Sequence, residues 1–316
     1  MAKQRLLNAG RIPAALEARL AQAYELISLA AQPDPGAYLA AHGAEFTALV
    51  TSAASGADAA LIGALPNLKV ISSFGVGLDK IDLACAHSRG IAVGYTPDVL
   101  NDCVADTAIA LMLDAARGLS AADRFVRRGE WTKGAFPLMR KVSGARLGVV
   151  GMGRIGRAIA QRAAGFGMDI RYHTRRPVAD VAWPHERSLI DLARWADFLI
   201  VITAGGAATR HLIDAGVLDA LGPDGFLVNV ARGSVVDEAA LIRALAEKRI
   251  AGAGLDVYEN EPHVPASLMA LDNVVLAPHI ASGTRETRQA MADRVFDNLH
   301  AYFAEGRPVS AAPPVA

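Results

Sequence analysis

The sequence predicts an α/β protein built on parallel sheets, and three observations support this class. Short apolar segments typical of strands alternate with segments whose apolar residues recur at helical spacing. A glycine-rich turn directly follows one of these strands, at Gly151. Hydrophobic residues make up 52% of the chain, and alanine and glycine are plentiful, which suits helices packed closely on a sheet.

Length, charge and cysteine content narrow the possible functions. The 316 residues suffice for two domains with sizeable cores. Lysine plus arginine and aspartate plus glutamate number 32 each, so no overall field attracts nucleic acid or an anionic membrane. No apolar run reaches the ~18 residues of a membrane span. Only Cys85 and Cys103 are present, without metal-ligand spacing. We expect reduced thiols, no metal site, no nucleic-acid or membrane partner, and a cytoplasmic location.

The first half of the chain alternates strand and helix signals. Expected strands cover residues 5–7, 24–29, 47–51, 70–73 and 91–93, and expected helices cover 12–23, 36–42 and 58–64. A long apolar helix follows over 101–117, and Gly118 is placed to end it. A second helix and an irregular segment then run to Met139. Exposed aromatic residues there, Trp131 and Phe136, favour a subunit interface, although they could instead cover the core.

The second half continues the same alternation. Expected strands cover residues 147–150, 169–173, 198–202, 226–229, 252–255 and 274–276, and expected helices cover 157–166, 237–248 and 283–303. A tail rich in proline and alanine, 307–316, is expected to be loose.

The turn after the strand at 147–150 carries the pattern Gly-x-Gly-x-x-Gly. Gly151 permits a tight turn, Gly153 allows backbone to approach a pyrophosphate, and Gly156 lets the following helix pack on the sheet. The helix start also offers unpaired N–H groups to a phosphate. We predict a dinucleotide site, because strand and helix flank the turn as this motif requires.

The residues after the next strand indicate which dinucleotide is bound. An NAD site usually has an acidic residue at that strand end, whereas this strand is followed by Thr174, Arg175 and Arg176. Two guanidinium groups hold a phosphate that a carboxylate would repel. We therefore predict NADPH as the preferred cofactor, with NADH used less efficiently. The alternative is two solvated arginines in a surface loop.

Three further side chains follow predicted strands of the second half. Arg232 follows the strand at 226–229, Glu261 follows that at 252–255, and His279 follows that at 274–276. Ligands bind at the carboxyl ends of strands in such sheets. A cation for a carboxylate, an imidazole to move a proton and a carboxylate to orient it form a usable catalytic set. Each residue taken alone is better explained by a structural role, and only the three together point to catalysis.

The chain resembles the D-specific 2-hydroxyacid dehydrogenase family, and within it the glyoxylate/hydroxypyruvate reductases. The matching pieces are Gly-Val-Gly-Leu-Asp-Lys-Ile-Asp at 75–82, Gly-Met-Gly-Arg-Ile-Gly at 151–156, Val-Asn-Val-Ala-Arg-Gly at 228–233, Asp-Val-Tyr-Glu-Asn-Glu-Pro at 256–262 and Ala-Pro-His-Ile-Ala at 277–281. They occur in the family's order and cover nearly the whole chain. One departure is Ala-Gly-Gly at 204–206, where many members have a proline-containing turn.

The resemblance implies two Rossmann-like domains with a ligand cleft between them. Residues 1–99 with 285–316 would form the substrate domain, and residues 100–284 would bind the cofactor and make a homodimer. Arg232, Glu261 and His279 would be catalytic. Backbone N–H groups of Val76 and Gly77, with Arg232, would bind the substrate. The implied cofactor contacts are Gly151, Gly153, Arg154, Ile155, Gly156, Thr174, Arg175, Arg176, Thr203, Val230, Asp256, which would contact the nicotinamide, His279 and Gly283.

The expected function is the NADPH-dependent reduction of a small 2-oxo acid, such as glyoxylate or hydroxypyruvate, to the D-2-hydroxy acid, with His279 as proton donor. Two alternatives stay open. One is an NAD-linked relative acting on another 2-hydroxy acid such as phosphoglycerate. The other is a nucleotide-sensing binding protein of the same fold.

Overall fold

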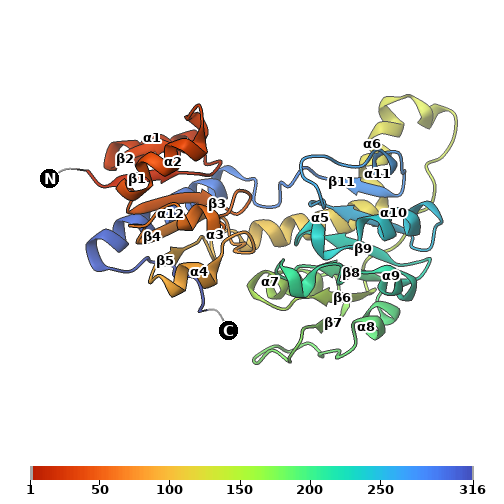
Figure 1. Ribbon diagram of the computed structural model, residues 1–316. Coiled ribbons are helices and arrows are strands. Elements are labelled where there is room, and N and C mark those ends of the chain that lie inside the picture. Colours follow the sequence, from red (N-terminus) through yellow and green to blue (C-terminus); the bar gives the residue numbers. More distant parts are fainter. Residues whose placement is uncertain (1–2, 315–316) are drawn as a thin grey trace. The chain divides into compact units, whose positions relative to one another are not determined.

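The computed structural model describes residues 3–314, which form two compact units (Figure 1). Unit 1 contains the residues up to Leu100 together with those from Thr284 onward, and unit 2 contains Asn101–Gly283. Each unit is built on one sheet in which every neighbouring pair of strands is parallel. The predicted α/β class with parallel sheets is confirmed.

Unit 1 has a five-stranded sheet in the order β2-β1-β3-β4-β5, which is a doubly wound arrangement. Helices α1 and α12 lie together on one face, and the core beneath α2, α3 and α4 fills the other. The strands are β1 (Arg5–Asn8), β2 (Glu25–Ser28), β3 (Ala48–Ser52), β4 (Val70–Phe74) and β5 (Ala92–Gly94). The helices are α1 (Ala14–Ala23), α2 (Pro35–His42), α3 (Ala59–Gly63), α4 (Leu83–Ser88) and α12 (Arg285–Glu305).

Aspartate side chains start three of these helices. Asp34, Asp58 and Asp82 each accept a hydrogen bond from the backbone N–H three residues ahead, at 2.8–3.0 Å. Such caps satisfy N–H groups that the first helical turn otherwise leaves unpaired. They explain why these short helices begin at these residues.

The tail after α12 is tied to the sheet, so the expectation that 307–316 is loose is wrong for its described residues up to Ala312. The Ser310 N–H donates to Asn298 Oδ1 at 2.8 Å, and the Ala312 N–H donates to the Val93 carbonyl at 2.7 Å. Gly94 and Ala311 form an antiparallel bridge. Because β5 is an edge strand, its free backbone groups accept the tail as a pairing partner.

Unit 2 has a six-stranded sheet in the order β11-β10-β9-β8-β6-β7. A core of aliphatic residues lies beneath α8, α9 and α10, while α5 packs against α7, β9 and β10. The strands are β6 (Arg146–Val150), β7 (Asp169–His173), β8 (Phe198–Val201), β9 (Phe226–Asn229), β10 (Gly252–Leu255) and β11 (Val274–Leu276). The helices are α5 (Asn101–Arg117), α6 (Leu119–Arg127), α7 (Arg154–Ala164), α8 (Leu189–Trp195), α9 (Ala215–Leu221), α10 (Glu238–Ala246) and α11 (Ala266–Met269).

The predicted strands of both units are present, with ends that differ by a residue or two. The largest difference concerns α7, which begins at Arg154 rather than at the expected residue 157. Gly156 therefore lies inside the first turn of the helix and not in the turn before it. Among the residues that the structure describes, no helix is long and apolar enough to cross a membrane.

Candidate active site

The glycine turn lies where the strand order of unit 2 reverses. The chain passes from β6 to β7 on one side and on to β8 on the other, and ligands bind doubly wound sheets at such a point. Gly151, at the end of β6, has φ +105°, and a Cβ there would lie 2.8 Å from the Thr203 nitrogen. A Cβ on Gly156 would lie 2.0 Å from the Gly151 carbonyl oxygen. Both glycines are thus required by close backbone contacts.

Gly153 differs from the other two glycines, because nothing lies within 4 Å of the place its Cβ would take. It is exposed and precedes α7 as its N-cap, without a side chain to cap the helix. Unpaired N–H groups and the positive end of the helix dipole therefore face open space. These residues fit the pyrophosphate of a dinucleotide.

The loop after β7 presents two exposed arginines. Within residues 3–314, neither Arg175 nor Arg176 forms a salt bridge, and both side chains are exposed. Thr174 donates its hydroxyl hydrogen to the Arg176 carbonyl at 2.6 Å. Two guanidinium groups without a compensating carboxylate form a local positive charge beside the glycine turn.

Several polar side chains hold this loop in place. The His185 Nε2 lies 2.9 Å from the Thr174 carbonyl oxygen, so that this nitrogen is the donor. The Val178 N–H donates to the Tyr172 hydroxyl at 3.0 Å, and Arg157 donates to the carbonyls of Ala179 and Asp180. The arginines therefore project from a supported loop rather than from a free one.

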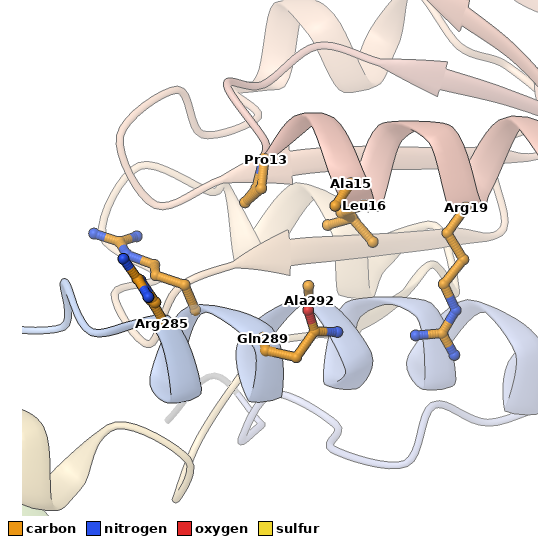
Figure 2. Close-up of a pocket in the computed structure, with 8 residues that line it drawn as sticks. Pro13, Ala15, Leu16, Arg19, Arg285, Gln289 and Ala292 are labelled. Carbon is orange, nitrogen blue, oxygen red and sulfur yellow. The ribbon is translucent and has the colours of Figure 1, made fainter.

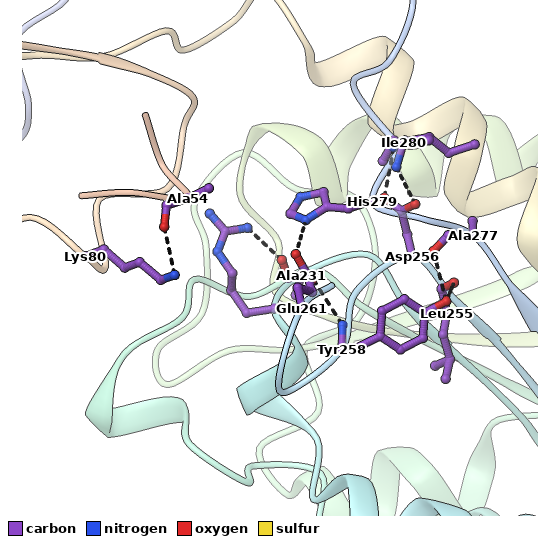
Figure 3. Close-up of polar contacts among 12 residues, drawn as sticks. Ala54, Lys80, Ala231, Leu255, Asp256, Tyr258, Glu261, Ala277, His279 and Ile280 are labelled. Carbon is purple, nitrogen blue, oxygen red and sulfur yellow. Dashed lines mark hydrogen bonds and ion pairs between the residues drawn. The ribbon is translucent and has the colours of Figure 1, made fainter. Parts of the chain in front are cut away.

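Glu261 and His279 are brought together by loops that follow β10 and β11. Figure 3 shows the two side chains directed toward each other, and His279 Nδ1 lies 2.7 Å from Glu261 Oε2. A carboxylate only accepts, so Nδ1 carries the hydrogen and Nε2 faces away from the pair. The imidazole is 45% exposed, which leaves it accessible to a substrate.

Arg232 lies near the His279–Glu261 pair because its loop, after β9, packs tightly against the loop after β10. A Cβ on Gly233 would lie 1.9 Å from the Tyr258 carbonyl carbon, so only glycine allows the loops after β9 and β10 to approach so closely. Burial alone would raise the pKa of Glu261. The hydrogen bond and charge of His279, an N–H from Tyr258 and the charge of Arg232 outweigh this and hold the pKa of Glu261 below its ordinary value.

Asp256 and Tyr258 support the site in ways that the sequence did not reveal. Asp256 is 1% exposed, and its carboxylate accepts the backbone N–H groups of Ile280 and Ala281 at 2.7 and 2.9 Å. His279 has φ +55°, an unfavourable backbone conformation that these two bonds help to fix. The Tyr258 hydroxyl donates to the Ala277 carbonyl at 2.9 Å. The spacing of Asp256 and Tyr258 in the sequence does not predict these contacts with the loop that carries His279.

Burial also changes the ionisation of these two groups. Burial raises the pKa of Asp256 despite the two backbone N–H donors, and burial with nearby carboxylates raises the pKa of Tyr258 to about 12. The Tyr258 hydroxyl therefore stays protonated and keeps its bond to Ala277.

An apolar cavity of about 260 Å³ adjoins the His279–Glu261 pair. Its walls are largely aliphatic, with Val264, Met269, Leu276 and Pro278 beside Tyr258. Such a wall excludes water from one side of the pair, and exclusion of water strengthens the interaction between the imidazole and the carboxylate.

Val76 and Gly77 lie in unit 1, in the loop after β4, so they are described apart from the residues of unit 2. In the part of the chain that the structure describes, no hydrogen bond uses their N–H groups. Two successive free N–H groups can bind an anion such as a carboxylate.

The remaining predicted cofactor residues all lie in unit 2. Arg154 and Ile155 begin α7, Thr203 follows β8, Val230 is buried after β9, and Gly283 is exposed at the end of the unit. Arg154, Ile155, Thr203 and Val230 each lie within five residues of the end of β6, β8 or β9. Among residues 3–314, no group of three or more His, Cys, Asp or Glu side chains is placed to hold a metal ion.

Comparison with known proteins places this arrangement in context. Residues 109–281 match the NAD binding domain of the D-isomer specific 2-hydroxyacid dehydrogenases. The chain is 49% identical to a glyoxylate/hydroxypyruvate reductase A of Arabidopsis thaliana, over 92% of each chain. It is 46% identical to a hydroxyphenylpyruvate reductase of Plectranthus scutellarioides, over 93% of this chain and 94% of the relative.

A solved structure is similar over nearly the whole chain. It is an NADPH-dependent glyoxylate/hydroxypyruvate reductase of Sinorhizobium meliloti in complex with NADP and malonate, with a TM-score of 0.91 and 42% identity. The comparison covers 99% of this chain and 98% of the other.

Proposed function

We propose, from the premise that this chain belongs to the D-isomer specific 2-hydroxyacid dehydrogenase family, that it reduces a small 2-oxo acid to the D-2-hydroxy acid with NADPH. Glyoxylate and hydroxypyruvate are the substrates that we favour, because relatives named for them are 42–49% identical. The observation that carries the proposal is the His279–Glu261 pair, 2.7 Å apart, at the same edge of the sheet as the glycine turn.

His279 acts as the proton donor. Reduction of a carbonyl places negative charge on its oxygen, and a proton from Nε2 neutralises that charge. Glu261 accepts the Nδ1 hydrogen, which fixes the orientation of the ring and leaves Nε2 directed away from the pair. When bound, NADPH supplies the hydride for the carbonyl carbon.

Arg232 and the loop of Val76 and Gly77 bind the substrate carboxylate. The planar guanidinium forms two parallel bonds to a carboxylate, and it also polarises the neighbouring carbonyl. Free N–H groups of Val76 and Gly77 serve the same anion from the backbone. A carboxylate held by Arg232 fixes the position of the carbonyl carbon and oxygen next to it.

The preference for NADPH rests on Arg175 and Arg176. Their loop is held by hydrogen bonds that leave both guanidinium groups exposed, and the sequence has no carboxylate directly after β7 to neutralise the two charges or repel a phosphate. Charge-assisted bonds of this kind contribute roughly 1.5–3 kcal/mol each. Since about 1.4 kcal/mol is tenfold in affinity, a preference of at least one order of magnitude follows.

The test compares kcat/KM with NADPH and with NADH at a fixed glyoxylate concentration. We expect at least a tenfold preference for NADPH, and we expect Arg175→Ala/Arg176→Ala to remove most of it by weakening NADPH use, with little gain for NADH. Arg187→Ala, an exposed arginine in the same region of unit 2, is the control. Equal wild-type efficiency with both cofactors would contradict the assigned preference, and no turnover of any 2-oxo acid would contradict the enzymatic function.

The chain also forms a homodimer through the segment 119–139 of unit 2. Several large apolar side chains are exposed there, among them Trp131 at 67% and Leu138 fully exposed, together with Leu119, Val126 and Met139. A concentrated apolar surface of this kind is typical of a subunit interface. Light scattering should give twice the 33.1 kDa mass of the chain, and Trp131→Ser/Leu138→Ser should shift the protein toward monomer. A wild-type monomer at micromolar concentration would contradict the dimer.

A further inference from the structure

A cavity of about 240 Å³ lies in unit 1 between the amino-terminal parts of α1 and α12. Figure 2 shows Pro13, just before α1, and Leu16 and Arg19 on α1 facing Arg285 and Gln289 on α12 across this space. Arg288 also contributes to the wall. Three of the lining residues are therefore arginines, and none of the lining residues has a carboxylate.

The three arginines are not equally neutralised. Arg19 Nη1 lies 2.6 Å from Asp293 Oδ1, and its guanidinium stacks on the Phe296 ring at 3.9 Å, so its charge is paired and its position fixed. Within residues 3–314, Arg285 and Arg288 form no salt bridge. The Arg288 guanidinium lies 5.7 Å from the centre of the Phe74 ring. Two positive charges at this cavity are left without a counterion.

The start of α1 adds backbone donors to the same wall. Pro13 precedes the helix and cannot cap it, and no side chain replaces that cap. The first N–H groups of this ten-residue helix, including those of Ala15 and Leu16 in the cavity wall, keep their hydrogen-bonding capacity. Together with the positive end of the helix dipole, they favour an anion.

The cavity also lies at the point where the strand order of unit 1 reverses. The chain leaves β1 between β2 and β3, and α1 follows directly from this turn. Gly10 lies in the turn, where a Cβ would be 2.6 Å from the Ser52 nitrogen, just as Gly151 is packed in unit 2. This is the position where doubly wound sheets bind ligands.

We propose that this cavity is a binding site for a doubly charged oxyanion, with a phosphate group as the chemistry it fits. Arg285 and Arg288 supply the two positive charges, and the start of α1 supplies N–H donors. The volume is below the roughly 300–1,000 Å³ of sites that hold larger organic ligands, so inorganic phosphate or a small phosphate monoester fits and a dinucleotide does not. The site uses none of the residues assigned to catalysis.

The test is isothermal titration calorimetry of the full chain at low salt, with saturating NADPH present so that phosphate cannot enter the dinucleotide site. The probes are inorganic phosphate and glycerol 3-phosphate, and acetate serves as the singly charged comparison. We expect one phosphate site per chain, with acetate binding at least tenfold more weakly. Tighter binding of glycerol 3-phosphate would identify a phosphate ester as the ligand, and tighter binding of inorganic phosphate would identify the free ion.

The matched variants are Arg285→Gln/Arg288→Gln and Lys69→Gln/Arg307→Gln, which remove the same charge. Lys69 precedes β4 at the opposite edge of the sheet, and Arg307 lies beyond the far end of α12. We expect the first variant to lose phosphate affinity at least tenfold and the second to keep it. If the first double variant fails to fold, Arg285→Gln alone removes one exposed side chain that has no salt bridge to lose. Equal phosphate affinity in the folded variants, or no phosphate site in the wild type, would overturn the proposal.

Discussion

The two units share a strand order but differ in the turn that follows their first strand. In the numbering of each unit, both sheets run 2-1-3-4-5, and unit 2 adds a sixth strand. In unit 2, three residues join β6 to α7 and two of them are glycines. In unit 1, five residues join β1 to α1 and the last is Pro13. The same sheet topology therefore provides the site, while the turn residues determine what can bind there.

The units also differ in the groups that they present at the carboxyl ends of their strands. Unit 2 presents side chains with opposite charges and a titratable imidazole, namely Arg232, Glu261 and His279. The loop after β4 in unit 1 presents backbone N–H groups at Val76 and Gly77. Proton transfer requires a group of the first kind, whereas holding an anion requires only the second.

The largest effect is expected from replacing His279, the residue of unit 2 to which proton transfer is assigned. Replacing it by glutamine removes the proton donor, and turnover should fall by about 10²–10⁴-fold, which is the usual contribution of a positioned general acid. NADPH affinity should change little. The measurement is single-turnover reduction of glyoxylate followed by cofactor absorbance.

The control is His263→Gln, which removes an exposed histidine from the same loop region as Glu261. It should retain near wild-type turnover. Near-native turnover in His279→Gln would show that another group donates the proton.

A second prediction separates the two functions of glycine in the turn of unit 2. Gly156→Ala places a methyl group 2.0 Å from a carbonyl oxygen, so α7 must move, and both the melting temperature and NADPH affinity should fall. Gly153→Ala meets no protein atom within 4 Å, so the melting temperature should hold while NADPH affinity falls at least tenfold.

Thermal unfolding and cofactor titration by fluorescence measure the two effects. Gly63→Ala, at the end of α3 in unit 1, also meets nothing within 4 Å and should change neither quantity. If Gly153→Ala bound NADPH as tightly as the wild type, the open space at this glycine would not be the cofactor site.

The smallest expected effect concerns the amino ends of the strands. Asp197, just before β8, accepts from the Arg146 backbone N–H at 2.9 Å and from the Arg146 and Arg140 side chains. The equivalent contact in unit 1 is neutral, with Thr47 Oγ1 donating to Gln4 Oε1 at 3.2 Å. Burial alone would raise the pKa of Asp197, but the hydrogen bonds and charges of Arg146, with the charge of Arg140, lower the pKa below its ordinary value.

A lowered pKa makes the stabilisation by Asp197 dependent on pH. The contribution is complete above the unfolded-state pKa of ~3.9 and is lost as the pH falls through the lower folded-state pKa. Asp197→Asn should lower the melting temperature by about 2–4 °C at pH 7, equivalent to about 1 kcal/mol. The gap to the wild type should shrink below about pH 4, as measured by circular dichroism. A gap that stayed constant down to pH 2 would exclude this ion pair as its cause.

Much of the fold could be predicted because its signals are local. The strand at 169–173 and the helix at 101–117 have the predicted ends, since apolar runs and a terminal glycine mark them. The start of α7 lies three residues before the predicted start, because Gly156, a poor helix former, lies in its first turn, where it packs on the Gly151 carbonyl. The pairing of the tail could not be predicted from local signals. It depends on Asn298, which lies in α12, and on the edge of β5, which is far from the tail in sequence.

The site shows the same limit. Arg232, Glu261 and His279 are predicted from their places after expected strands and from family motifs, and the structure brings His279 and Glu261 into contact. The roles of Asp256 toward the backbone of Ile280 and of Tyr258 toward Ala277 were not found. Each is a contact between two loops about 20 residues apart, and no periodic pattern encodes such a pairing.

The return of the chain to unit 1 has a consequence for synthesis on the ribosome. Unit 1 begins at the amino-terminal end but lacks α12 until residues from Thr284 onward have been made, and buried Ser72 in β4 bonds to the Val295 carbonyl of that helix at 3.1 Å. All residues of unit 2 leave the ribosome before α12 does, and domains generally fold as units during translation. Unit 2 can therefore complete its fold first, while the face of the unit 1 sheet that α12 covers is left to α1 alone until the residues from Thr284 onward arrive.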